Sequence, residues 1–403
     1  MIRAKNHQII LAKCFMFLIT LVFITAGCVP LTETPSLTNN IRFEPTNFSN
    51  IPYWDDDDHE IALEAFNRSC KAILNNPYDT NITTQNPHKN KNWFAVCEIA
   101  STLERANNNA AKKFFEKFFV PYSVGQGSIK EGLFTGYYEP VIRGSLSRSE
   151  RYNVPLYGIP SDMISIKLNE FSDDFPDKVI TGRLQGSKFI PYYTRSDIEN
   201  GKAGLQGSEI AWLEDYTDSF FLHIQGSGQI LFEDGSRKRI SYAASNGHKY
   251  FAIGRKLIQD GEIPKAEISM QRIREWLKQN PSRAKSLTEQ NPSYIFFRWN
   301  NNTNTKVGPI GSQGIPLTSG RSIAIDRRFF TFGTPIWLKT KIPAAQENKK
   351  QDIYRLVIAQ DTGSAIKGII RGDLFIGTGD EAGEIAGKMK EIGRYWVFLP
   401  KIK

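Results

Sequence analysis

Short runs of β-branched and aromatic residues, separated by glycine, aspartate and asparagine, fill two distant parts of this sequence and constrain its fold more than any other feature. One part extends from about Gly132 to Ile240, and the other covers roughly the last hundred residues. Apolar residues at helical spacing lie before the first part and between the two. Because helix and strand patterns alternate in this order, we predict a mainly β protein with flanking α-helices, in which one β domain is inserted into another unit.

The composition supports a large folded protein and excludes several function classes. The 403 residues are 40% hydrophobic, which is enough for two or three structural units. Lys and Arg exceed Asp and Glu by only 51 to 42 without a dense basic run, so a nucleic-acid partner is not expected. The five histidines are scattered and no G-x-S-x-G motif occurs. We therefore expect no metal site, no cofactor and no Ser-His-Asp hydrolase.

The N-terminus has the layout of a secretory signal. Basic residues precede the apolar run Cys14–Thr25, which is short for a membrane span, and small residues then lead to Cys28. This arrangement is similar to a bacterial lipobox and predicts a signal peptide over residues 1–27 with a lipidated Cys28. An ordinary secreted protein and a retained anchor helix are the alternatives. Val29, in place of Asp, favours the outer membrane, and the Pro-, Thr- and Asn-rich segment 28–50 is expected to be a tether.

Two smaller features concern the region after the tether. Cys70 and Cys97 form either a disulfide, as an oxidising compartment allows, or two separate buried thiols, and the sequence does not decide between them. The acidic run Asp55–Asp58 is interpreted as the solvated start of a helix, because acidic groups stabilise a helix N-terminus.

Carboxylates are the plausible catalytic groups. Asp326, Asp361 and Asp373 lie in the C-terminal β region, at the end of apolar strands or beside glycine. Such positions desolvate a carboxylate, although each Asp taken alone could be a turn cap or a structural acceptor. Aromatic and polar motifs elsewhere could line a polysaccharide groove, namely Thr135–Tyr138, Tyr192–Tyr193 and Gln225–Ser227. For Tyr192 and Tyr193, packing inside a barrel is an equally open interpretation.

A series of motifs in order along the chain closely resembles the membrane-bound lytic murein transglycosylase A family. These motifs are FTGYYEP at 134–140, WLEDYTDSFFLHIQGSG at 212–228, YAASNGHKYFAIGRKLI at 242–258, NPSYIFFRW at 291–299 and AQDTGSAIKGIIRGDLFIGTGDEAGEIAGKM at 359–389. The resemblance extends from about residue 130 to the C-terminus. It implies a lyase, of the lytic exotransglycosylase type, that cleaves the β-1,4 bond between N-acetylmuramic acid and N-acetylglucosamine of peptidoglycan and leaves 1,6-anhydromuramoyl ends.

The resemblance also implies the fold and the cellular location. A double-psi β-barrel would be built from both chain ends, by residues 51–140 with the N-terminal helices and by residues 246–403. An inserted second β-barrel would occupy residues 141–245, with the glycan in the groove between the barrels. The expected location is the periplasmic face of the outer membrane, reached through an N-terminal acyl anchor. Peptidoglycan strands are the expected partner, cell-wall synthesis or division proteins are further candidates, and a monomer is expected.

In the family, a single aspartate is the catalytic acid, and it corresponds to Asp373 here. Asp361 and Asp326 correspond to the other two aspartates of the C-terminal three-aspartate domain. Some members are one residue shorter between the last two aspartates and have His-Phe-Asp in place of Arg-Gly-Asp. The substrate-binding residues expected besides these two aspartates are Thr135, Tyr137, Tyr138, Gln225, Gly226, Ser227 and Lys367.

One carboxyl can serve as acid and then as base when the substrate supplies its own nucleophile, the muramoyl C6 hydroxyl. Asp373 must then begin protonated, so we predict a raised pKa, with Lys367 and Arg371 facing the glycan or solvent. Two alternatives remain: a muramidase that uses Asp361 and Asp373 as a carboxylate pair, and a peptidoglycan-binding lipoprotein without activity. The sequence does not distinguish endo- from exo-action or reveal the glycan and peptide preference.

Overall fold

The computed structural model describes residues 41–75, 90–104, 106–176, 178–300, 307–344 and 349–401. The expected signal peptide 1–27, Cys28 and the tether up to residue 40 lie outside the described residues. Within these described ranges, no helix is long and apolar enough to cross a membrane.

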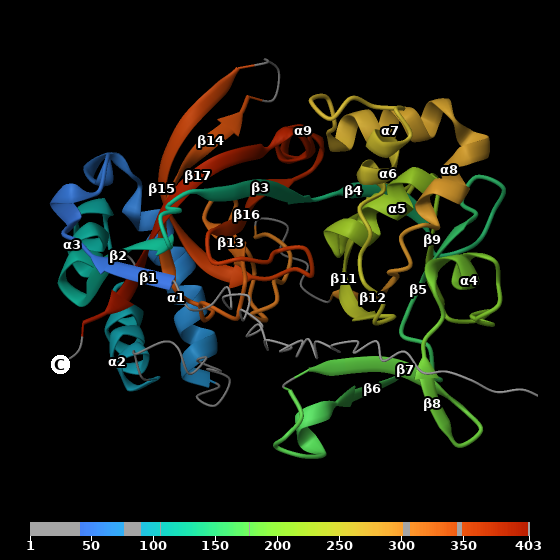
Figure 1. The fold of residues 1–403 in the computed structure, drawn as a ribbon, viewed down its shortest axis with the longest axis horizontal. Coiled ribbons are helices and arrows are strands. Elements are labelled where there is room, and N and C mark those ends of the chain that lie inside the picture. The colour runs from blue at the N-terminus through green and yellow to red at the C-terminus, as the bar shows by residue number, and fades with distance from the viewer. Residues whose placement is uncertain are drawn as a thin grey trace, which may run out of the picture. The chain divides into compact units, whose positions relative to one another are not determined.

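One strand from the first β region and five strands from the last hundred residues close into a six-stranded barrel (Figure 1). The strands are β3 (Gly132–Glu139), β13 (Ser322–Ile325), β14 (Pro335–Pro343), β15 (Lys350–Asp361), β16 (Arg371–Thr378) and β17 (Lys390–Pro400). Their order is β17-β14-β15-β13-β16-β3, and β3 pairs back with β17. β16 runs parallel to β3 and β13 runs parallel to β15, whereas the other neighbours are antiparallel. This is the predicted barrel made from both chain ends.

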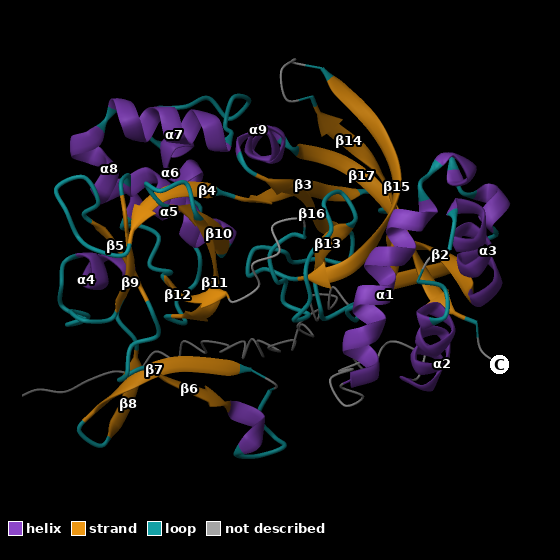
Figure 2. Ribbon diagram, turned by 180° about the vertical axis from the view of Figure 1, so that it is seen from behind, coloured by secondary structure: helices purple, strands orange, loops and turns teal. Residues whose placement is uncertain are grey.

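Alternating residues of the barrel strands fill two different cores. On β15, Val357 and Ala359 belong to the barrel interior, while Leu356 and Ile358 belong to the core under the N-terminal helices. Successive side chains of a strand point to opposite faces, so an apolar run with both faces buried serves both cores. The helices on the outer face are α1 (His59–Asn75), α2 (Asn90–Ser101) and α3 (Asn108–Phe118) (Figure 2).

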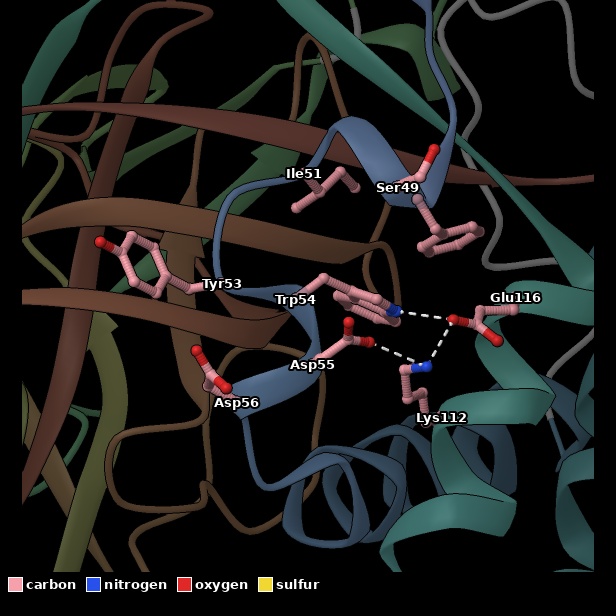
Figure 3. A pocket seen from close by; sticks show the side chains of 9 residues that line it. Ser49, Ile51, Tyr53, Trp54, Asp55, Asp56, Lys112 and Glu116 are labelled. Carbon is pink, nitrogen blue, oxygen red and sulfur yellow. Dashed lines mark hydrogen bonds and ion pairs between the residues drawn. The ribbon is translucent and has the colours of Figure 1, made fainter.

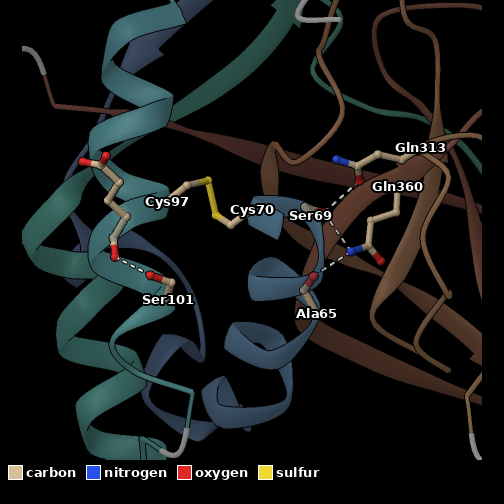
Figure 4. Close-up of a disulfide and its surroundings, with 8 residues drawn as sticks. Ala65, Ser69, Cys70, Cys97, Ser101, Gln313 and Gln360 are labelled. Atoms are coloured by element: carbon tan, nitrogen blue, oxygen red, sulfur yellow. Dashed lines mark hydrogen bonds between the residues drawn. A yellow bond between two sulfur atoms is a disulfide. The ribbon is translucent and has the colours of Figure 1, made fainter. Parts of the chain in front are cut away.

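A disulfide between Cys70 and Cys97 joins α1 to α2 (Figure 4). It decides between the two alternatives that the sequence left open. The solvated interpretation of Asp55–Asp58 is wrong for Asp57, which is buried. Its Oδ2 accepts bonds from Arg321 Nη1 at 2.7 Å and from the Leu356 N–H at 2.8 Å. Asp57 thereby attaches the segment before α1 to β15.

The folded body begins before the predicted end of the tether. Residues Ile41–Pro45 form strand β1, which pairs antiparallel with β2 (Phe119–Gln126), and β2 pairs with β17. The short helices η1 (Phe48–Asn50) and η2 (Trp54–Asp56) follow. The prediction of a tether up to residue 50 is therefore wrong over 41–50. The composition of this segment is typical of a flexible linker, but pairing of β1 with β2 gives it a defined structure.

The inserted part contains a second sheet of six strands. They are β4 (Val141–Ser145), β5 (Val154–Tyr157), β9 (Glu209–Leu213), β10 (Ser227–Leu231), β11 (Arg237–Ser245) and β12 (Ile295–Asn300). The order is β12-β11-β10-β4-β9-β5, and the two edge strands β5 and β12 contact each other. A separate sheet holds β6 (Ile164–Lys167), β7 (Val179–Gln185) and β8 (Lys188–Pro191). The short helix η3 (Leu168–Glu170) connects β6 to β7.

The insert extends further than the sequence predicted. β12 pairs with β11, so the insert continues to Asn300 and does not end at residue 245. The helices of the insert are α4 (Arg195–Glu199), α5 (Tyr216–Gln225), α6 (Ile253–Gln259), α7 (Met270–Gln279) and α8 (Pro281–Thr288). Four of them, α5 to α8, share one apolar cluster. Tyr192 is buried in another cluster of the insert, where it packs against Phe296, so its role is packing.

Candidate active site

The strand register aligns two of the three predicted aspartates. Asp373 on β16 lies opposite Thr135 on β3 and opposite Ala324 on β13, and Ala324 in turn lies opposite Asp361 on β15. Residues paired across neighbouring strands project to the same face. Thr135, Asp373 and Asp361 therefore form one row across four strands, and only the small side chain of Ala324 separates the two carboxylates. We call Thr135, Asp373, Ala324 and Asp361 the aspartate row.

The half-buried Asp373 has the electrostatic setting of an acid. Thr135 donates from Oγ1 to Asp373 Oδ1 at 2.5 Å. Burial raises the pKa of Asp373 above its ordinary value of 3.8, and the negative charge of Asp361 adds to this rise. The charge of Arg371 and the bond from Thr135 act in the opposite direction without outweighing burial. The direction of this pKa shift agrees with the prediction from the sequence.

Arg371 does not lie where the sequence analysis predicted. It is half-buried, and its Nη2 donates to Thr135 Oγ1 at 2.8 Å. Its Nη1 donates to the carbonyl oxygens of Leu133, at 3.3 Å, and of Gly372. Arg371 and Asp373 are two residues apart on β16, so they share a face of the strand, and the arginine therefore turns toward the row. Lys367 is exposed, in agreement with the prediction.

Asp361 is held by donors on both of its oxygens. Oδ2 accepts from Tyr137 Oη at 2.8 Å. Oδ1 accepts from Ser312 N at 2.9 Å, from Ser312 Oγ at 2.6 Å and from Thr362 N at 2.9 Å. Burial, followed by the charge of Asp361, raises the pKa of Tyr137 well above its ordinary value, so this phenol remains a donor. A carboxylate with so many donors is held in place as an acceptor.

Asp326 stands apart from the row and is only 1% exposed. Its oxygens accept from Arg328, through the backbone N–H and the guanidinium, and from the Gly368 N–H at 2.8 Å. Burial alone would raise the pKa of Asp326, but these bonds outweigh burial and lower it. The buried carboxylate of Asp326 holds the loop before β16, and a contact of Asp326 with substrate stays a prediction.

Tyr138 is 7% exposed. It points to the opposite face of β3 from Thr135 and Tyr137 and is buried against Ala382 and Ala386 of α9 (Asp380–Lys388). Its backbone N–H donates to Gln225 Oε1 at 3.2 Å. The Tyr138 side chain therefore packs between β3 and α9, and a substrate contact of this side chain stays a prediction.

The segment 225–227 lies beside β3 because of this bond to Gln225. Gly226 has φ 77° and ends α5, a conformation that glycine adopts without steric cost, and Ser227 begins β10. The structure thus places Gln225, Gly226 and Ser227 at the junction of β3 with the insert, next to the strand that holds Thr135.

Sequence reasoning missed Ser312, which supplies two of the donors to Asp361. The loop that contains it is anchored on α1: Ser69 Oγ donates to Gln313 Oε1 at 2.8 Å (Figure 4). Gln360, directly before Asp361, donates from Nε2 to Ala65 O at 2.7 Å and to Ser69 Oγ at 2.9 Å. These contacts join residues far apart in the chain, so no local sequence pattern predicts them.

A surface pocket lies away from these residues, beside η1, η2 and α3 (Figure 3). Lys112 pairs with Asp55 and Glu116 there, and Trp54 Nε1 donates to Glu116 at 2.9 Å. None of the predicted site residues that the structure describes lines this pocket. In the part of the chain that the structure describes, no group of His, Cys, Asp and Glu side chains could hold a metal ion.

Family models match both domains of the chain. The MltA specific insert domain matches residues 133–298, and the 3D domain matches residues 321–399. The first match agrees with an insert that includes β12. Together they confirm the family resemblance that the sequence motifs indicated.

Similar proteins extend these matches to most of the chain. The chain is 36% identical over 269 residues to membrane-bound lytic murein transglycosylase A of Escherichia coli (strain K12), which covers 66% of this chain and 64% of that protein. The chain thus spans slightly less than two thirds of that relative. The crystal structure of MltA from Neisseria gonorrhoeae has 36% identity and a TM-score of 0.73 and covers 91% of this chain and 94% of that chain. The structure of Escherichia coli MltA with bound chitohexaose has 27% identity and a TM-score of 0.64 and covers 91% and 98%. The predicted double-psi barrel with an inserted β domain is confirmed by this likeness.

Proposed function

The chain belongs to the membrane-bound lytic murein transglycosylase A family, and from this premise we propose that it cleaves the β-1,4 bond between N-acetylmuramic acid and N-acetylglucosamine of peptidoglycan. The products would carry 1,6-anhydromuramoyl ends. One observation carries the proposal: Asp373 is a half-buried carboxyl whose pKa is raised, and it lies in one row with a second carboxylate, Asp361, that donors hold on both oxygens.

Asp373 acts first as acid and then as base. Its carboxyl protonates the leaving glycosidic oxygen as the C1–O4 bond breaks. The muramoyl C6 hydroxyl attacks C1, and the resulting carboxylate takes the proton of that hydroxyl, so Asp373 ends protonated as it began. General acid–base catalysis of this kind contributes roughly 10²–10⁴ in rate. The charge of Asp361 supports the first step because it favours the protonated form of Asp373.

The surroundings of Asp361 argue against a two-carboxylate hydrolase. A general base or nucleophile reacts best through an oxygen whose negative charge is not already engaged by donors. Asp361 accepts four hydrogen bonds, three on Oδ1 from Ser312 and the Thr362 N–H and one on Oδ2 from Tyr137, which hold the carboxylate in place and weaken it as a nucleophile. Its role in the proposal is therefore electrostatic and positional.

The substrate and the location rest on the relatives. A bound chitohexaose in the Escherichia coli relative supports a glycan as the ligand, with Thr135, Tyr137, Lys367 and segment 225–227 as candidate contacts. Relatives named as membrane-bound support membrane association. We further propose anchoring at the outer membrane through a lipidated Cys28. Protein partners and a monomeric state stay predictions.

The test is digestion of purified peptidoglycan followed by mass spectrometry of the released muropeptides. The wild type is expected to produce anhydro ends, and Asp373→Asn and Asp373→Ala are expected to lose about 10²–10⁴ of the rate. Asp352→Asn is the matched control, since Asp352 is exposed on β15. Reducing ends would instead indicate a hydrolase. Equal turbidity loss by wild type and Asp373→Ala would remove Asp373 from its role, and glycan binding without cleavage by the wild type would leave a binding lipoprotein.

A further inference from the structure

The Thr135 hydroxyl lies between Arg371 and Asp373. Arg371 Nη2 donates to Thr135 Oγ1 at 2.8 Å, and Thr135 Oγ1 donates to Asp373 Oδ1 at 2.5 Å. A guanidinium has donors only, whereas a hydroxyl has one hydrogen and two lone pairs. The bond from Arg371 therefore uses a lone pair of Thr135, and the single hydrogen of Thr135 is directed to Asp373.

The two oxygens of Asp373 differ in their surroundings. Oδ1 accepts the bond from Thr135, while Oδ2 has no hydrogen-bond partner among the residues that the structure describes. In the opposite arrangement, Asp373 would donate from Oδ1 to Thr135. The hydrogen of Thr135 would then have no acceptor in the described part of the chain, since Arg371 and Asp373 are the bonded partners of this hydroxyl there. A half-buried hydroxyl loses stability when its hydrogen is left without a partner.

We propose that Arg371 is a positioning residue that acts through Thr135: it keeps Asp373 Oδ1 an acceptor in both protonation states, so that Oδ2 gives and later regains the transferred proton. This inference rests on the proposed lytic function and adds which atom performs it. Oδ2 loses its proton to the glycosidic oxygen as C1–O4 breaks. It then takes the proton of the C6 hydroxyl as C1–O6 forms.

Arg371 is built into β16 firmly enough to hold this position. Its Nη1 donates to the carbonyl oxygens of Leu133 and Gly372, which fixes the guanidinium at the edge of β3. Gly372 allows the strand to lie close to the barrel interior, because a Cβ there would come within 2.5 Å of Ile323 Cδ1. The spacing of Arg, Gly and Asp thus puts a cation and a carboxyl on one strand face.

Groups on the neighbouring strands face Asp373, and beyond them β17 places the exposed Lys390 opposite Thr135. β16 contributes Arg371, which favours the ionised carboxylate, and β15 contributes Asp361, which disfavours it. β3 contributes Thr135 and the phenol of Tyr137, and β13 contributes the uncharged Ala324. Removing the charge of Arg371 therefore raises the pKa of Asp373 further. Since the first step needs the protonated form, the alkaline limb of the pH–rate profile then moves to higher pH.

The experiment compares Arg371→Met, Arg371→Lys, Thr135→Val, Thr135→Ser and the double variant Arg371→Met/Thr135→Val. The rate of anhydromuropeptide release is measured against pH and substrate concentration. We expect Arg371→Met and Thr135→Val each to lower kcat about 10- to 100-fold with KM nearly unchanged, because a charge-assisted bond is lost. Both should move the alkaline limb to higher pH.

The conservative and double variants test whether Arg371 positions Asp373 through the Thr135 hydroxyl. Thr135→Ser keeps the hydroxyl and should keep most of kcat, and Arg371→Lys should recover part of it. At the pH optimum the double variant should be no slower than the slower single variant, because the positioning effect of Arg371 passes through Thr135, whereas its charge acts directly on the pKa of Asp373. Arg298→Met, at an exposed strand position of β12, is the matched control. Carboxyl NMR titration of Asp373 in the folded Arg371→Lys and Thr135→Ser proteins gives a readout that does not need the stronger variants to fold.

Three results would overturn the inference: an unmoved pH profile in Arg371→Met, a change in KM alone, or additive losses in the double variant. Each of these leaves Asp373→Asn inactive and anhydro ends in the wild type. Failure of the proposed function would show differently, as reducing ends or an active Asp373→Asn.

Discussion

The three aspartates of the C-terminal domain are chemically identical residues in three different settings. Asp373 has one occupied oxygen and a raised pKa, Asp326 is buried under Arg328 with a lowered pKa, and Asp361 is held by donors on both oxygens. Burial favours the neutral carboxyl, and bonds from N–H or guanidinium groups favour the ionised one. The balance of these two effects distinguishes Asp373, the proposed proton carrier, from the two aspartates that act as acceptors.

The charge of Asp361 gives a prediction opposite in sign to that for Arg371. Asp361 raises the pKa of Asp373, so Asp361→Asn should lower it. The protonated form of Asp373 is then lost at lower pH, and the alkaline limb of the pH–rate profile should move to lower pH. The measurement is the rate of anhydromuropeptide release from pH 4 to 9, with exposed Asp352→Asn as the control. A limb that moves upward would contradict this electrostatic role.

At the scale of elements, α1 connects the N-terminal helices to the aspartate row. Its residues Ala65 and Ser69 contact Gln360 and Gln313, which adjoin Asp361 and Ser312. The disulfide at Cys70 attaches the same helix to α2. The position of the donors to Asp361 therefore depends on a helix that contributes no side chain to the row.

The disulfide should stabilise the fold mainly because it restricts the conformations of the unfolded chain. Cys70 and Cys97 are 27 residues apart, and closing a loop of that length stabilises the fold by about 3–4 kcal/mol in the chain-entropy model. Cys70→Ser/Cys97→Ser should lower the free energy of unfolding by this amount in urea denaturation. Wild type with reductant should match the double variant. An unchanged midpoint in both would show that the bridge does not constrain the unfolded state.

At the scale of the whole molecule, a buried ion pair joins the barrel to the insert. Glu139, at the end of β3, is fully buried and accepts from Arg239 of β11 at 2.5 Å. It also accepts from Gln229 of β10 at 2.8 Å and from Thr378 of β16 at 2.9 Å. Strands of both sheets thus converge on one carboxylate at the end of the strand that holds Thr135.

Removing one partner of this pair should lower the free energy of unfolding more than removing both partners. Arg239→Met leaves the charge of Glu139 buried and is expected to lower the free energy of unfolding by about 3–5 kcal/mol. Glu139→Met/Arg239→Met should recover part of that loss. Thermal and urea unfolding measure both variants, and Arg237→Met, exposed on the same strand, is the control. A double variant no more stable than Arg239→Met would refute the coupling.

Much of the fold and part of the site could be predicted from the sequence. The alternation of helix and strand patterns along the sequence predicted two β regions and their helices, and the order of the motifs predicted the family. The end of the insert and the start of the folded body were misplaced, because β12 and β1 are recognised only by their pairing with β11 and β2. The direction of the pKa shift of Asp373 was predicted, but the orientation of Arg371 was not.

The sequence by itself determined which residue types stand at each position of the strands and motifs, since these are local patterns of spacing and side-chain chemistry. The tertiary structure alone decided which of those residues meet. Thr135 is 236 residues from Arg371 and 238 from Asp373, so their bonds exist only because β3 and β16 pair in register when the barrel closes. That register leaves one oxygen of Asp373 without a partner among the described residues.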